Sequence, residues 1–107
     1  MKNLLPIGSV VLLQGAQKKI MIYGRIQVQQ EDDKVWDYIG CTYPEGNIRP
    51  ENSYLFDHES IDTVYFIGFQ DKEEFEFKKY LEQELEKRTG EESESGNFNR
   101  PSDSEQE

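Results

Sequence analysis

The sequence has few of the residues that enzymes and metalloproteins use for chemistry, with one cysteine and one histidine among 107 residues. A lone cysteine forms no internal disulfide, which is typical of a protein from a reducing cytosol. Cys41 lies in an apolar stretch and is expected to be a small core residue. His58 has no second histidine or cysteine with which to bind a metal. We therefore expect a protein that is not an enzyme, with no catalytic, cofactor-binding or metal-binding residues.

Positive charge is also scarce. The chain has 12 Lys and Arg residues against 22 Asp and Glu residues, which gives a net charge of −10. No basic cluster supplies the electrostatic attraction on which nucleic-acid binding depends. An acidic chain is also repelled by anionic membrane surfaces. The expected partner is therefore a basic or neutral protein, and neither nucleic acid nor membrane.

Long apolar runs are absent as well. A membrane-spanning helix needs about 20 consecutive apolar residues, and no segment of this chain approaches that length. Pro6 and Gly8 interrupt the apolar run at the N-terminus, and no small-residue cleavage site follows it. These features do not fit a secretory signal peptide, so the expected location is the cytoplasm.

The end of the chain differs in composition from the rest. Residues 89–107 are rich in Ser, Glu, Gly and Asn, and Phe98 is their only large apolar residue. Such a segment buries too little apolar surface to offset the entropy lost on ordering it. We predict a disordered acidic tail over 89–107, after a single folded domain over 1–88.

Short extended segments dominate the predicted domain. Gly24 stands inside the longest of them, where it indicates a bulge or a sharp bend. Polar turn residues follow at 31–34, and a loop with two prolines is expected over 44–53. Asp57 is expected to cap a single helical turn over 58–62. The predicted strands are Val10–Leu13, 19–30, 35–43, Tyr54–Phe56 and 63–69.

One helix is predicted, over about 71–88. Asp71 and Glu74 have the spacing of a capping box, with Asp in place of Ser or Thr. Phe77, Leu81 and Leu85 recur at helical spacing and form an apolar stripe. Gly90 is expected to end the helix. The predicted fold class is α+β, mainly β: a small curved antiparallel sheet, or an SH3-like partly open barrel, with a C-terminal α-helix.

Some polar and aromatic residues need an explanation beyond folding. Arg25 lies within a predicted strand and needs a carboxylate or carbonyl partner, for which Asp37 is one possibility. The aromatic residues exceed what one small core is expected to hide, so either the helix covers them or some remain exposed at an interface. The candidate partner-binding residues are Arg25, Trp36, Tyr38, Tyr43, Glu45, Asn47 and Tyr54.

Three motifs resemble a known family. They are PIGSVV at 6–11, MIYGR at 21–25 and DYIGCTYPEGN at 37–47, and the resemblance extends from Leu4 to about Glu76. In order and spacing they resemble a family of small bacterial proteins catalogued as domain of unknown function 4176. The helix continuation and the acidic tail match that family only in general character.

The resemblance implies a setting. Proteins of this family are encoded in Gram-positive bacteria beside toxins with an LXG-type N-terminal domain, which leave the cell through the type VII secretion system. The family resembles accessory factors that bind such toxins in the cytosol, and it has no assigned catalytic residues. The expected function is a targeting factor or chaperone that binds the toxin's N-terminal domain. The alternative is an immunity protein that inhibits the toxin's enzymatic domain.

Overall fold

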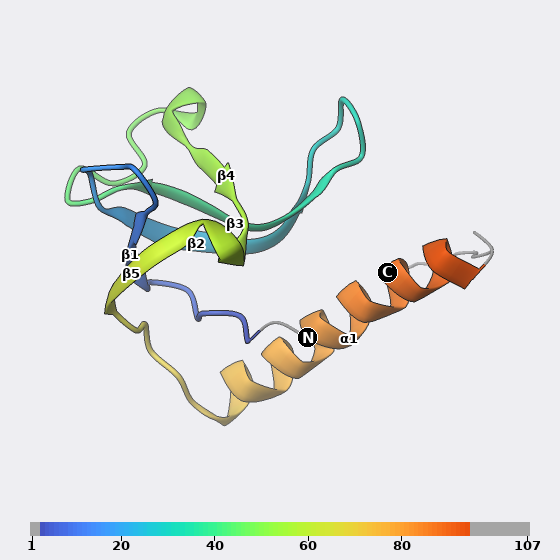
Figure 1. Cartoon of the computed structure of the whole chain (residues 1–107). Coiled ribbons are helices and arrows are strands. Elements are labelled where there is room, and N and C mark those ends of the chain that lie inside the picture. The colour runs from blue at the N-terminus through green and yellow to red at the C-terminus, as the bar shows by residue number, and fades with distance from the viewer. Residues whose placement is uncertain (1–2, 95–107) are drawn as a thin grey trace.

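The chain folds into one antiparallel sheet followed by one helix. The structure is a computed structural model that describes residues 3–94, and the side chains of 3–87. The sheet has the strand order β4-β3-β2-β1-β5, and β4 and β5 form its two edges without closing on each other (Figure 1). This confirms the predicted mainly-β, α+β class. The strands are β1 (Val10–Leu13), β2 (Ile20–Val28), β3 (Val35–Thr42), β4 (Tyr54–Phe56) and β5 (Ile61–Phe66).

The sheet is curved by irregularities in β2. The pairing of β2 with β3 shifts register between Ile22 and Gly24, which confirms the predicted bulge. A Cβ atom on Gly24 would lie 2.7 Å from a methyl group of Ile39, so a larger residue does not fit there without movement. Farther along β2, Ile26 has φ of +53°, a left-handed conformation that β-branched residues rarely adopt. The long strand therefore bends where it passes over the core.

Two single-turn 3-10 helices separate the last strands. The first, η1 (Pro50–Asn52), falls within the predicted loop, and the second, η2 (His58–Ser60), falls within the predicted helical turn. The prediction that the Asp57 side chain caps this turn is wrong. Its Oδ1 instead accepts a hydrogen bond from the backbone N–H of Asp37, at 3.2 Å, because the carboxylate points across to β3. The last strand also begins at Ile61, before the expected Thr63, and ends at Phe66.

The C-terminal helix α1 spans Lys72–Glu94. Asp71 caps it as predicted: its Oδ1 accepts the backbone N–H of Glu74 at 2.9 Å. The prediction that Gly90 ends the helix is wrong. A glycine inside a helix costs only about 1 kcal/mol relative to alanine, and the Glu residues that follow are good helix formers. The remainder of the predicted tail, 95–107, lies outside the described residues.

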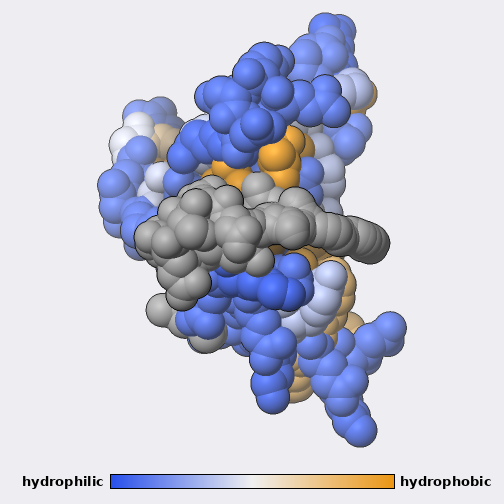
Figure 2. Space-filling model, turned by 90° about the vertical axis from the view of Figure 1, so that its right-hand side faces the viewer, coloured by the Kyte–Doolittle hydropathy of each residue, from blue (hydrophilic) through white to orange (hydrophobic). Residues whose placement is uncertain are grey.

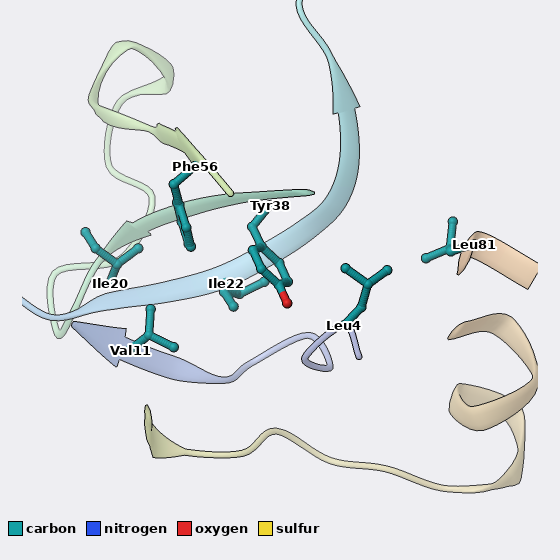
Figure 3. Close-up of a cluster of buried hydrophobic side chains, with 7 residues drawn as sticks. All are labelled: Leu4, Val11, Ile20, Ile22, Tyr38, Phe56 and Leu81. Carbon is teal, nitrogen blue, oxygen red and sulfur yellow. The ribbon is translucent and has the colours of Figure 1, made fainter. Parts of the chain in front are cut away.

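The core lies between the sheet, the N-terminal segment and one residue of α1. Tyr38 and Ile22 face each other at its centre, and Leu4 lies between them and Leu81 of the helix (Figure 3). Cys41 is buried as predicted. Leu81 is the only buried apolar residue that α1 supplies among the described side chains, so apolar packing alone attaches the helix weakly. The buried cluster consists of Leu4, Val11, Ile20, Ile22, Tyr38, Phe56 and Leu81.

Polar contacts complete the attachment of α1. Both terminal nitrogens of Arg25, in β2, donate to the carboxylate of Glu74 at 2.7 Å. The side chains of this ion pair are only 3% and 12% exposed. Arg25 thus has the carboxylate partner that the sequence predicts, and that partner is Glu74. Asp37, the possibility named from the sequence, accepts the backbone N–H of His58. Glu82 also accepts the backbone N–H of Leu4, at 3.1 Å, so the N-terminal segment is held between sheet and helix.

We predict that Glu74→Gln destabilises the protein by roughly 3–5 kcal/mol, because it leaves the buried Arg25 guanidinium without a counter-charge. The matched control is Glu76→Gln, which breaks an exposed pair with Lys72 whose side chains are 88% and 69% exposed. That change is expected to cost less than about 1 kcal/mol. Urea unfolding followed by helical circular dichroism measures both. Equal losses in the two variants would contradict this role of the ion pair.

Candidate functional site

Two of the seven candidate partner-binding residues lie in the interior. Arg25 is 8% exposed and is engaged by Glu74, and Tyr38 is fully buried. The Tyr38 hydroxyl accepts the backbone N–H of Leu5 at 2.9 Å and shares a hydrogen bond with Nδ1 of His58 at 2.7 Å. Neither side chain is available to a partner in this structure. Their family-motif positions are explained by the way they join the N-terminal segment and the helix to the sheet.

Burial changes the acidity of the central tyrosine. The pKa of Tyr38 is raised from 10.0 to about 12 because burial disfavours the phenolate, and the hydrogen bond from Leu5 offsets only part of this effect. The hydroxyl is therefore neutral at physiological pH. His58, within the predicted helical turn over 58–62, is half-buried and belongs to the same hydrogen-bonded group.

Four other candidates lie near one another at one end of the sheet, where the β3–β4 loop approaches the β1–β2 turn (Figure 1). We name this group, Tyr43, Glu45, Asn47 and Tyr54, the turn surface; all four are exposed. Lys18 contacts Glu45 at 2.9 Å, and its hydrogen bond holds the pKa of that carboxyl below its usual range. These residues stay a predicted partner contact.

The remaining candidate, Trp36, lies at the opposite end of β3. Its Nε1 donates to Oε1 of Gln29 at 2.9 Å, and the Lys34 ammonium lies 4.3 Å from the ring centroid. Both partners come from the β2–β3 hairpin, so the ring is engaged in holding that hairpin together. The structure does not bring Trp36 and the turn surface together.

Sequence reasoning missed the largest set of exposed apolar side chains. It lies on β5 and the segment after it, and we name it the β5 surface. The run at 63–69 has the composition of a buried strand, and composition alone does not distinguish a core strand from an exposed edge. The sequence does contain one indication of exposed apolar residues, because it has more aromatic residues than one small core is expected to hide. The β5 surface consists of Val64, Tyr65, Phe66, Ile67 and Phe69, all exposed.

The helix does not cover these residues. Instead it exposes aromatic side chains of its own, Phe75, Phe77 and Tyr80. Phe77 and Tyr80 stack with their centroids 6.1 Å apart, and the Arg25 guanidinium lies 5.7 Å from the Phe77 ring. The view in Figure 2, toward the side on which α1 ends, shows a mainly hydrophilic surface interrupted by apolar areas. Apolar and hydrophilic areas therefore lie beside one another on this face.

The described part of the chain shows neither a metal site nor a membrane-spanning helix. Within residues 3–94, no group of three or more His, Cys, Asp or Glu side chains is arranged to hold a metal ion. No helix in the same part of the chain is both long and apolar enough to cross a membrane. Large exposed side chains lie on the turn surface, on the β5 surface and on α1.

We predict that the stability contributed by Tyr38 falls between pH 10 and pH 12. Its folded-state pKa is raised, so the unfolded chain loses the proton first, and the contribution is complete only below pH 10. Tyr38→Phe should lose about 1–3 kcal/mol at neutral pH, because the Leu5 N–H loses its acceptor. The free energy of unfolding is measured as a function of pH for the unaltered protein and for Tyr38→Phe. The difference between the two curves isolates Tyr38, because the other tyrosines contribute equally to both. A difference that stays constant from pH 9 to pH 12 would contradict the prediction.

Comparison with known proteins identifies the family. Residues 4–77, more than half of the chain, match the family described as Domain of unknown function (DUF4176). No curated protein matches the chain, and no solved structure does. The matched region contains all five strands, the bulge at Gly24 and the Arg25–Glu74 pair. The chain belongs to the DUF4176 family.

Proposed function

We propose that this protein is a non-enzymatic cytoplasmic accessory factor that binds an LXG-type toxin and promotes its type VII secretion. Its proposed partner is the N-terminal domain of that toxin, for which it acts as a targeting factor or chaperone. The chain belongs to the DUF4176 family. The proposal is supported by what the resemblance to that family implies, namely a gene that lies beside that of such a toxin.

The observation that carries the proposal is the exposure of large apolar side chains. The β5 surface and the aromatic residues of α1 present apolar area to solvent on a domain of modest size. Exposed apolar patches rimmed by polar residues are typical of protein-binding sites. Meanwhile the polar residues that sequence reasoning singled out, Arg25, Tyr38 and His58, form internal contacts that hold the fold together.

The charge of the chain supports a basic partner. At −10, the protein attracts a basic protein over long range and repels other copies of itself. Complementary charge raises association rates and suppresses wrong partners. The same charge also suits the alternative, an immunity protein, because an acidic inhibitor fits a basic nuclease. The two functions differ in which half of the toxin is bound.

We expect the protein to co-purify with the N-terminal domain of the toxin encoded beside it when the two are co-expressed with one affinity tag. The toxin's C-terminal enzymatic domain is the matched control and is expected to stay unbound. Deletion of this protein's gene should reduce toxin in the culture medium to the level of a strain without the secretion system, and a plasmid copy should restore it.

Normal toxin secretion in the deletion strain would contradict the accessory function. The immunity function would instead be established by two results together. The protein would bind the toxin's C-terminal domain, and its expression alone would protect cells from the toxin.

A further inference from the structure

The β5 surface lies on an edge strand that nothing covers among the described residues. Every residue of β5 after Ile61 is exposed, and the exposure continues beyond the strand. Phe66 is 60% exposed and Phe69 is 79% exposed. Neighbouring residues in a regular stretch of strand point to opposite faces. Thr63 and Val64 pair with Leu12 and Val11 without a register shift and are both exposed, so both faces of β5 are open there. Figure 1 shows β5 at the sheet edge, with the chain leaving it toward α1.

The surface is continuous with the N-terminal segment and is held in place. Gly68 packs so closely on the backbone of Ile7 that an added Cβ would lie 2.0 Å from the Ile7 carbonyl oxygen. The Gly68 N–H donates to Oγ of Ser9, which in turn donates to the carbonyl oxygen of Pro6. Ile7 is itself half exposed beside this contact. The apolar residues therefore form one preformed area, which lowers the entropic cost of binding.

Acidic residues lie at both ends of this apolar run. Asp62 precedes it and Asp71 and Glu73 follow it, and all three are exposed. Two exposed cations also belong to this region. The Lys19 ammonium lies 5.0 Å from the Tyr65 ring centroid, and Lys72, which stands between Asp71 and Glu73, contacts the carboxylate of Glu76 at 3.8 Å. Since the Asp71 carboxylate accepts a hydrogen bond in the helix cap, Asp62 and Glu73 are the more available anions. An apolar area with anionic ends complements an apolar segment with cationic ends.

The charges distinguish between possible occupants. A second copy would bring another net charge of −10 to an acidic rim. The chain's own residues 95–107 carry one basic residue and three acidic ones, a net charge of −2, and Phe98 is their only large apolar residue. A second copy and residues 95–107 are both net negative, so the acidic residues beside the β5 surface repel either of them. Residues 95–107 also offer little apolar area. Charge complementarity therefore favours a different, basic protein.

The form of the partner follows from the bulges in β5. Val10 and Val11 pair with Phe66 and Val64, which leaves Tyr65 as an extra residue of β5. Asp62 is extra in the same way, between the partners of Leu12 and Leu13. Bulges disturb the regular row of outward backbone groups and make an edge a poor template for another strand. A partner can therefore bind this edge through side chains rather than by adding a strand. The apolar face of an amphipathic helix binds in that way.

We propose that the β5 surface binds an amphipathic helix of the partner, with the apolar face of that helix against Phe66, Ile67 and Phe69. Lys or Arg residues at the ends of the helix lie against Asp62 and Glu73. This inference deepens the proposed function and rests on it, because the partner chosen as the probe is the N-terminal domain of the neighbouring toxin.

The first test compares exposed apolar residues inside and outside the surface. Ile67→Asp combined with Phe69→Asp should weaken binding of the toxin's N-terminal domain at least about tenfold, measured by calorimetry on the full chain. Val28→Asp is the matched control, an exposed apolar residue at the far end of β2, and should leave the Kd unchanged. Ile67 and Phe69 both lie beyond the end of β5, so thermal unfolding should show that the double variant folds.

The second test makes the same change of net charge at two different places on the protein. Asp62→Lys with Glu73→Lys, and the control pair Glu31→Lys with Glu51→Lys, each add four charges and change −10 to −6. All four residues are exposed. The first pair should weaken binding more than the control pair at low salt, and the difference should shrink at high salt. Equal effects of the two pairs would overturn the placement of the helix on this surface.

Failure of the inference and failure of the proposed function give different results. If the unaltered protein does not bind the toxin's N-terminal domain, the proposed function fails. If it binds and the Ile67/Phe69 variant binds equally well, the function stands and the β5 surface is overturned. Loss of binding in the turn-surface variant Tyr43→Asp, with binding kept in the β5 variant, would also overturn it.

Discussion

The buried ion pair between Arg25 and Glu74 is the interaction on which the arrangement of sheet and helix depends. Among the side chains that the structure describes, the helix contributes only Leu81 to the buried apolar cluster, so apolar packing alone holds it weakly in position. The bidentate contact between Arg25 and Glu74, at 2.7 Å, fixes both the distance and the orientation of the first turns of the helix relative to β2. Removal of the Arg25 guanidinium from water is costly, and its Nε has no hydrogen-bond partner. This cost makes the pair specific, because no other carboxylate replaces Glu74 without moving the helix.

The N-terminal segment joins the two halves of the structure and leaves the outer surfaces free. Its backbone contacts Tyr38, Arg25 and Glu82, so it occupies the space in which a helix would usually pack on a sheet. Because the segment fills this space, the aromatic residues of α1 and β5 have nothing left to cover them. The fold therefore buries Arg25 and Tyr38 and exposes large apolar side chains on β5 and α1, which supports the proposal that this protein binds another protein.

Local patterns in the sequence predicted the elements well, and long-range contacts explain the failures. The helix cap at Asp71, the bulge at Gly24 and the burial of Cys41 each depend on neighbouring residues, and each was predicted. The Glu74 carboxylate, the other half of the predicted capping box, accepts hydrogen bonds from Arg25. The partner of Arg25 is 49 residues away along the chain, and nothing in the local pattern distinguishes Glu74 from other carboxylates. For the candidate partner-binding residues, the local pattern did not show burial: Tyr43 and Tyr54 are exposed and stay predicted contacts, whereas Tyr38 fills the centre of the core.

The sequence by itself determined the class of the protein: a small acidic β-rich domain with one C-terminal helix, and the motifs of its family. These properties follow from composition, periodicity and turn residues, which act over a few residues. Only the tertiary structure decided which apolar residues are exposed. The run from Val64 to Phe69 has the composition of a core strand, yet the strand order places it at an edge and the N-terminal segment keeps the helix away from it. Exposure depends on what lies opposite a residue in space, and that is set by contacts between distant parts of the chain.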